Sequence, residues 1–152
     1  MKLSQTVAYG IHSVLRLAPT PEGSPVSCGM LAEQGNMPER FLLQILRGLG
    51  KQGILQSTRG GGGGFMLARR PDEISLLEVI EAVEGRMVAG LPIKNDLPGP
   101  AGKRLLDVME DITEHARGEL QAIKFSDLAN EEADAEPPST KKAKRSQRQR
   151  EP

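Results

Sequence analysis

Four side chains of one predicted helix have the chemistry needed to recognise nucleic acid. In residues 38–51 (PERFLLQILRGLGK), steps of four, three and four place on one face Arg40, Gln44, Arg47 and Lys51. The opposite face is apolar and is predicted to be buried, with Leu42, Ile45, Leu46 and Leu49. Cations pair with phosphates, whereas an amide offers both a donor and an acceptor to a base edge. We therefore predict a DNA-recognition helix.

A predicted β-hairpin with a basic turn follows this helix. Two short strands, residues 54–58 (ILQST) and 65–67 (FML), flank five consecutive glycines, and Arg59 stands at the base of the turn. Arg69 and Arg70 follow the second strand. A phosphate-binding P-loop would need Lys-Ser or Lys-Thr after its last glycine, followed by a helix, and neither is present here. A recognition helix followed by such a hairpin predicts a winged helix-turn-helix.

The preceding segments predict the helices that would position this unit. Helices are expected over residues 4–18 and 27–34, each opened by a serine that can cap it. A Gly-Asn turn at 35–36 leads into the recognition helix, and if Asn36 caps that helix, Glu39 completes a capping box. The predicted fold is therefore mainly α with a small β-hairpin.

A connecting helix, a loop and a long helix are predicted after the hairpin. Residues 75–78 (SLLE) form a capping box that opens an apolar helix ending at Gly85, and the Pro- and Gly-containing segment 86–102 predicts a loop. From Lys103, apolar side chains recur as in a coiled-coil seam, at Leu105, Met109, Ile112, Ala116, Leu120 and Ile123. This seam predicts a homodimer. The alternative is packing of the long helix against the first helix of its own chain.

The 152-residue chain has no net charge, but its charges are unevenly distributed. Residues 1–70 hold 8 basic and 3 acidic side chains, whereas residues 71–130 hold 6 and 12, which indicates a polyanion-facing module joined to a different part. Residues 130–152 are charged with almost nothing apolar, so we predict a disordered tail whose basic run could touch the DNA backbone. No stretch has the length of a membrane span, and the expected location is the cytoplasm.

The sequence contains no recognisable catalytic set. No nucleophile stands in a matching motif with a base, and the two histidines, His12 and His115, have no second ligand at metal-site spacing. The single cysteine, Cys28, is near the predicted start of the second helix, where its pKa could be lowered, so it is a redox candidate. The alternative is a buried thiol that packs as a small apolar group. We predict no enzymatic activity and no cofactor.

These residues together resemble the Rrf2 family of bacterial winged-helix regulators, over about residues 1–130. The likeness is carried by residues 39–42 (ERFL), by the wing at 57–60 (STRG) and 62–65 (GGGF), and by 79–85 (VIEAVEG). The resemblance implies a homodimeric transcriptional regulator, a repressor in preference to an activator, on a partly palindromic operator. Arg59 would enter the minor groove, while Arg40 and Gln44 would contact the major groove. The full set of candidate DNA-contacting residues is Ser4, Glu39, Arg40, Phe41, Gln44, Arg47, Arg59, Gly60 and Gly61.

The chain departs from the family pattern at two places. Sensing members hold an iron–sulfur cluster with three cysteines in the loop equivalent to 86–102, and this loop contains none. Some members add an acidic ligand from the first helix, where Ala8 stands here, so the resemblance implies a cluster-free regulator. In addition, Leu43 occupies a recognition-helix position that is often polar in the family, so base preference does not carry over.

The predicted organisation has four parts. A winged helix-turn-helix domain spans 1–85, the cysteine-free loop 86–102, a dimerisation helix with a short terminal helix 103–129, and the disordered tail 130–152. The favoured function is sequence-specific binding of double-stranded DNA by a homodimeric transcriptional regulator. The alternative is a winged-helix protein-interaction module that has lost operator binding.

Overall fold

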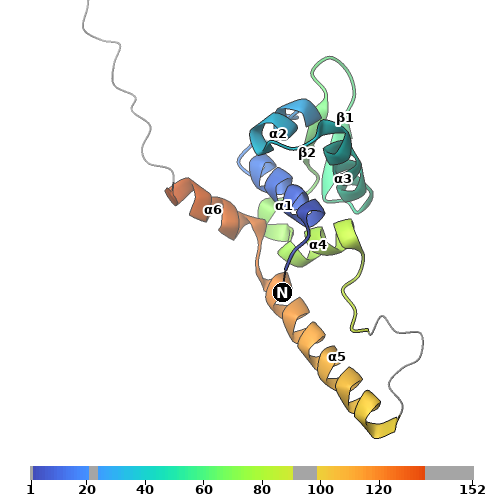
Figure 1. Ribbon diagram of the computed structural model, residues 1–152. Helices are drawn as coiled ribbons and strands as arrows, with labels where there is room; N and C mark the ends of the chain where they lie inside the picture. Colours follow the sequence, from blue (N-terminus) through green and yellow to red (C-terminus); the bar gives the residue numbers. More distant parts are fainter. Residues whose placement is uncertain (1, 21–23, 91–98, 136–152) are drawn as a thin grey trace, which may run out of the picture.

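Helices α1 to α4 pack together with a two-stranded hairpin at one side to form a winged unit, and a long helix extends away from it (Figure 1). The computed structural model describes residues 2–20, 24–90 and 99–135. Its elements in chain order are α1 (Gln5–Leu17), α2 (Cys28–Gly35), α3 (Glu39–Lys51), β1 (Leu55–Thr58), β2 (Gly64–Leu67), the 3-10 helix η1 (Pro71–Glu73), α4 (Leu76–Glu84), α5 (Gly99–Ala122) and α6 (Phe125–Ala135). The predicted fold class, mainly α with a small β-hairpin, is confirmed.

Serine caps set the first residue of three helices, as the sequence predicts. The side chains of Ser4, Ser27 and Ser75 each accept a hydrogen bond from the backbone N–H three residues further on. At Ser75 the capping box is complete, because the Glu78 carboxylate accepts a bond of 2.9 Å from the Ser75 backbone N–H. These bonds satisfy N–H groups that have no partner inside the helix.

The start of α3 differs from the prediction. Asn36 adopts a left-handed conformation (φ 49°, ψ 50°) and ends α2, so the capping box expected between Asn36 and Glu39 does not form. Asparagine tolerates this conformation better than most residues, and the tight turn between the two helices needs it. Pro38 precedes α3 without a side-chain cap.

The core lies among α1, α3 and α4. The apolar face predicted for α3 is buried in full, at Leu42, Ile45, Leu46 and Leu49. It packs in one cluster with side chains of α1, α4 and the hairpin. Phe125, the first residue of α6, is completely buried in the same cluster, and its N–H donates to the Ile74 oxygen at 3.0 Å. Phe125, with Leu128 packed against the same cluster, thus attaches the terminal helix to the rest of the chain.

Two predicted boundaries are wrong. Helix α5 begins at Gly99 rather than Lys103, because Pro100 falls in its first turn, where a missing N–H costs nothing. Helix α6 continues to Ala135, so residues 130–135, assigned to a disordered tail, are helical. Alanine and glutamate, which favour helices, supply four of these six residues. The remainder of the predicted tail and the centre of the predicted loop lie outside the described residues.

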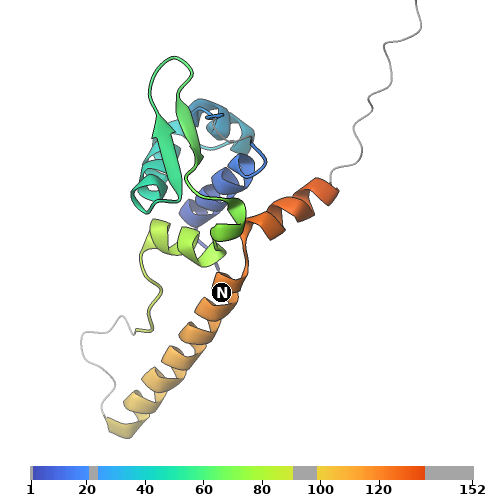
Figure 2. The same cartoon turned by 180° about the vertical axis from the view of Figure 1, so that it is seen from behind.

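The wing and α5 lie at opposite ends of the molecule, as the view from behind also shows (Figure 2). The two ends therefore present separate surfaces to partners. None of the helices described here is both long enough and apolar enough to pass through a bilayer.

Candidate nucleic-acid interface

The exposed face of α3 carries the predicted cations and amide. Arg40, Gln44, Arg47 and Lys51 are all exposed, opposite the buried face of the helix. Among the residues that the structure describes, Arg40 and Arg47 take part in no ion pair or side-chain hydrogen bond. Their charges are therefore available for phosphates.

Neighbouring helices fix the first turn of α3. The Cys28 thiol in α2 donates to the Glu39 backbone oxygen at 3.6 Å. On the other side, the rings of Tyr9 in α1 and Phe41 in α3 meet edge to face, with centroids 6.0 Å apart and an interplanar angle of 76°. The end of α3 that would enter a groove is thus positioned from both sides.

The hairpin forms a wing with a tight glycine turn. Its strands pair antiparallel, with Leu55 opposite Leu67 and Thr58 opposite Gly64. The Gly63 N–H donates to the Gly60 oxygen at 3.0 Å, which closes the turn. Arg59 is exposed where β1 leads into this turn, and the wing projects beyond α3 in Figure 1. The predicted position of Arg59 in the wing is therefore confirmed, and its contact with DNA stays a prediction.

A third segment anchors the wing. Val26 and Phe65 exchange two backbone hydrogen bonds, of 2.9 and 2.8 Å, as in an antiparallel bridge. A side chain at Gly64 would place its Cβ only 2.3 Å from the Val26 oxygen, so glycine is required there. No local pattern in the sequence indicates this bridge, because Val26 is distant along the chain from Phe65 and lies in a loop. The glycine run therefore serves both the turn and the approach of Val26.

The arginines after the wing are engaged by the protein itself. Arg69 donates to the Gly53 oxygen (3.3 Å), the Glu73 oxygen (3.2 Å) and the Glu78 carboxylate (2.7 Å). Arg70 pairs with Asp72 at 2.6 Å. Both residues therefore hold η1 and α4 beneath the wing, in contrast to Arg59.

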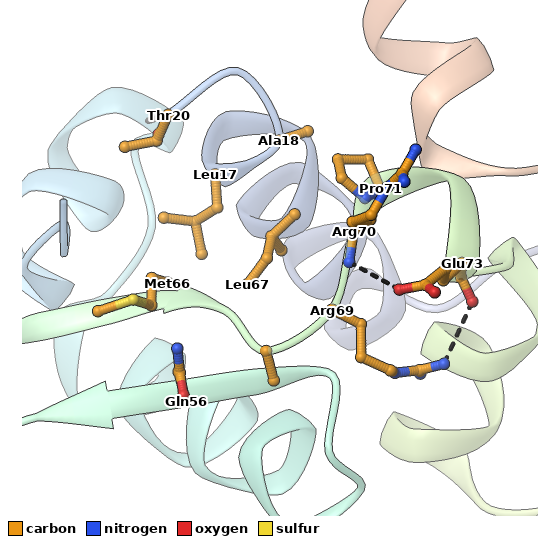
Figure 3. A pocket seen from close by; sticks show the side chains of 11 residues that line it. Leu17, Ala18, Thr20, Gln56, Met66, Leu67, Arg69, Arg70, Pro71 and Glu73 are labelled. Atoms are coloured by element: carbon orange, nitrogen blue, oxygen red, sulfur yellow. Dashed lines mark hydrogen bonds between the residues drawn. The ribbon is translucent and has the colours of Figure 1, made fainter. Parts of the chain in front are cut away.

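A groove opens between the end of α1, the base of the wing and η1 (Figure 3). Leu17, Leu67 and Pro71 form part of its apolar wall. Arg69, Arg70 and Glu73 are its charged groups. The dashed bonds in Figure 3 run from the Arg69 guanidinium to the Glu73 backbone oxygen and from the Arg70 backbone N–H to the Glu73 carboxylate. The two guanidinium groups pair with other carboxylates, Arg69 with Glu78 and Arg70 with Asp72. Among the described residues that line it, the groove therefore offers no free cation to an anionic ligand.

Cys28 is half-buried and does not have the properties of an activated thiol. Burial raises the pKa of the Cys28 thiol, the Glu39 carboxylate raises it further, and the Arg47 guanidinium opposes both. The prediction that the helix N-terminus lowers this pKa is therefore wrong. The local environment matches the alternative, a thiol that packs between α2 and α3.

The iron–sulfur cluster of the sensing relatives does not fit the donors of this chain. Such clusters are held by several cysteine thiolates, sometimes with histidine. The sequence contains one cysteine, and its S–H is directed at the Glu39 oxygen between two helices of the winged unit. Ala8, at the position of the extra acidic ligand, has no donor atom.

The predicted dimer seam divides into two parts. Leu120 is only 7% exposed and packs against Val7, Leu77 and Ile80 of its own chain. The placement of Leu120 in an intersubunit seam is therefore wrong. The Ile123 backbone oxygen accepts a 2.9 Å bond from the Leu76 N–H, but its side chain is half-buried and its place in the seam stays a prediction.

The first half of α5 keeps its apolar side chains exposed. Leu105 is 38% exposed and Ile112 64%, while Met109 and Ala116 are half-buried. Val108, which the predicted spacing missed, is 46% exposed and lies three residues after Leu105 and four before Ile112. We call Leu105, Val108 and Ile112 the α5 stripe. The predicted seam takes a step of four residues from Leu105 to Met109. A rule that also allowed a step of three from Leu105 would have found Val108.

Comparisons with known proteins agree with this architecture. A family model described as "Rrf2: Iron-dependent Transcriptional regulator" matches residues 3–131. The HTH-type transcriptional regulator CymR of Bacillus subtilis (strain 168) is 29% identical over 136 residues, which cover 82% of this chain and 99% of CymR.

Solved structures give the same result. The structure of CymR, titled the global cysteine regulator of B. subtilis, matches with a TM-score of 0.71 and 28% identity, over 86% of this chain and 98% of that one. The T. potens IscR structure matches with a TM-score of 0.70 and 26% identity, over 90% of this chain and 92% of that one. The family match covers the winged unit, α5 and most of α6. This chain belongs to the Rrf2 family of transcriptional regulators.

Proposed function

We propose that this chain binds double-stranded DNA sequence-specifically as a homodimer and acts as a repressor without an iron–sulfur cluster. The observation that carries the proposal is the free cationic face of α3, on a unit whose other arginines near the wing are paired. Arg40 and Arg47 are exposed on α3, and Arg59 is exposed on the wing. Within the described part of the chain none of these three guanidinium groups has an ion-pair partner, and three such groups on neighbouring elements suit a polyanion better than a protein surface.

The two elements suit the two grooves of DNA. The major groove admits an α-helix, and a side-chain amide such as that of Gln44 can bond both edge atoms of an adenine. A narrow minor groove concentrates negative potential and attracts an arginine such as Arg59. Arg40 and Arg47 lie on the same face of α3 as Gln44 and would contact flanking phosphates. Ser4, Glu39, Gly60 and Gly61 belong to the proposed surface on the family resemblance alone.

The α5 stripe supports a homodimer. Three large apolar side chains exposed in one row on a charged helix need a partner surface, and a second copy supplies the same row by two-fold symmetry. A two-fold dimer carries two α3 helices and therefore contacts two half-sites of a partly palindromic operator. Repression follows where such an operator overlaps a promoter.

The winged-helix interaction module is the second candidate. The exposed arginines Arg40, Arg47 and Arg59 argue against it, since an interaction module has no need of exposed guanidinium groups on both α3 and the wing. We expect fragments selected from genomic DNA to share a partly palindromic site that the protein prefers over random duplex.

The test compares the wild type with Gln44→Ala on that site and on random duplex. On the selected site the variant should lose about 1–3 kcal/mol of binding free energy, together with its preference at one base pair of each half-site. Its affinity for random DNA should change little. Failure of the wild type to retard any duplex at low salt would favour the interaction module.

A further inference from the structure

Phe41 is an exposed aromatic ring on the helix proposed to enter the major groove. Its side chain is 44% exposed. The structure describes α3 in full, and no other large apolar side chain of this helix is exposed. It lies in the first turn of α3, the part closest to the turn between α2 and α3. An apolar ring in this place contributes nothing to phosphate binding.

Two residues of α1 hold the ring in place. Tyr9 meets Phe41 edge to face at 6.0 Å, and the Tyr9 hydroxyl accepts a 2.8 Å bond from the Gln5 side chain. An aromatic pair of this geometry restricts the Phe41 side chain before any partner arrives. Binding then loses little side-chain freedom at this position.

Phe41 lies three residues before Gln44 in α3. Residues three apart are neighbours on a helix surface, and they are separated by about 4.5 Å along the axis. That separation is close to the roughly 3.4 Å between successive base pairs. When α3 lies in the major groove, the two side chains therefore reach neighbouring base pairs.

The major groove presents one apolar group, the 5-methyl of thymine; its other edge atoms are hydrogen-bond donors and acceptors. Contact between an apolar ring and the methyl group stabilises the complex. Contact between the ring and a donor or acceptor costs free energy, because the polar atom loses its water and gains no hydrogen bond. We propose that Phe41 contacts the 5-methyl group of one thymine in each half-site, next to the base pair that Gln44 contacts. This inference rests on the proposed function.

Deoxyuridine tests the contact directly, because it lacks only the methyl group of thymine. Each thymine of the selected operator is replaced in turn by deoxyuridine, symmetrically in both half-sites, and the affinity of the wild type is measured by competition. One position should weaken binding by about fourfold per half-site, the value for burial of one methyl-sized group. Phe41→Ala should remove this penalty, so that it binds the thymine and deoxyuridine duplexes equally.

Met30→Ala is the matched control. Met30 is another large apolar side chain, 52% exposed on the neighbouring helix α2, and the inference gives it no base contact. This variant should keep the full deoxyuridine penalty. Thermal unfolding of both variants verifies that they are folded. A second measurement needs no variant: 5-iododeoxyuridine at the sensitive position, irradiated in the wild-type complex, should cross-link to Phe41 as identified by mass spectrometry.

The outcomes separate the inference from the proposed function. A specific operator with no methyl-sensitive thymine, or a penalty that Phe41→Ala retains, overturns the inference and leaves DNA binding intact. A cross-link at another residue also overturns it. If the wild type prefers no duplex over random DNA, the proposed function fails and the inference fails with it.

Discussion

Helices α3 and α5 are both amphipathic, and they differ in what they leave exposed. In α3 the apolar face is buried within the chain and the exposed face is cationic. In α5 the apolar residues of the first half remain exposed, and only near its end does Leu120 enter the chain's own core. The exposed chemistry thus indicates a polyanion at α3 and an apolar surface at α5.

The arginines follow the same division. Arg117 of α5 is mostly buried and donates to the Glu81 carboxylate and, at 3.2 Å, to the Met87 oxygen. It fixes the chain where it leaves α4, as Arg69 fixes the chain where it leaves the wing. Arg40, Arg47 and Arg59 are exposed instead. An arginine that bonds to other residues of the chain is therefore structural, whereas an exposed arginine without such bonds is a candidate DNA contact.

The largest effect is expected from Ile112→Asp in the α5 stripe. If two copies bury this side chain, the new carboxylate loses its water, which costs several kcal/mol. The dimer should dissociate to monomer in sedimentation velocity, and operator affinity should fall with it. Asp107→Asn, on the charged side of α5, is the control and should leave the dimer intact.

A soluble Ile112→Asp dimer with unchanged sedimentation would contradict an interface at the α5 stripe. Leu120→Ala sharpens the division of α5 further. Because Leu120 packs within its own chain, this change should lower the free energy of unfolding, by about 2–5 kcal/mol for a buried leucine. It should not separate the subunits in the folded protein.

A smaller effect is expected from Arg59→Ala on the wing. Loss of one phosphate contact should reduce the slope of log affinity against log salt by about one, and should weaken operator and random DNA alike. Arg70→Ala is the matched control, because Arg70 follows the same hairpin and is paired with Asp72. Equal salt slopes for the wild type and Arg59→Ala would remove the wing from the DNA surface.

The smallest effect is expected at Glu78, which lies between the wing and α5: it bonds Arg69 after the wing, and its partner Ser75 bonds Gln121 of α5. Burial alone would raise the pKa of Glu78, but bonds from the Ser75 backbone, Arg69 and the Ser75 hydroxyl outweigh it and lower the pKa. A lowered pKa means that the carboxylate stabilises the fold above its unfolded-state pKa and that this contribution is lost as pH falls through the folded-state pKa.

Glu78→Gln should therefore lower the free energy of unfolding at neutral pH by about 0.5–2 kcal/mol, the value of a helix cap. The pair with Arg69 is about one-third exposed (36% and 33%), so its share is small. The difference from the wild type should vanish in acid. Glu84→Gln, which changes an exposed carboxylate at the end of the same helix, is the control and should leave the free energy of unfolding at neutral pH close to that of the wild type. Denaturant unfolding at several pH values measures the Glu78→Gln effect.

The features that the sequence predicted are local ones. The burial of the α3 stripe follows from helical spacing, and the serine caps and the capping box at Ser75 follow from residue types three positions apart. The features that it missed depend on distant partners. The bridge between Val26 and Phe65 and the insertion of Phe125 into the core leave no periodic signal in their own segments.

The candidate site shows the same limit. Helical spacing and residue type were enough to place Arg40, Gln44 and Arg47 on one exposed face. They were not enough to separate Arg59 from Arg69, since only the fold shows that Arg69 is engaged by Gly53, Glu73 and Glu78. Likewise the seam pattern ran continuously along α5, and only tertiary packing shows that Leu120 belongs to the core of its own chain.

The most direct test of the account is operator binding by a variant in which Arg40, Arg47 and Arg59 are all replaced by alanine. The three side chains are exposed and lie apart from the α5 stripe, so the variant should remain folded and dimeric in sedimentation velocity. We predict that it loses both operator binding and binding to random duplex at low salt, while a variant with Lys103 and Arg104 replaced, cations at the far end of α5, binds like the wild type. Wild-type affinity in the triple variant would contradict a DNA surface formed by α3 and the wing.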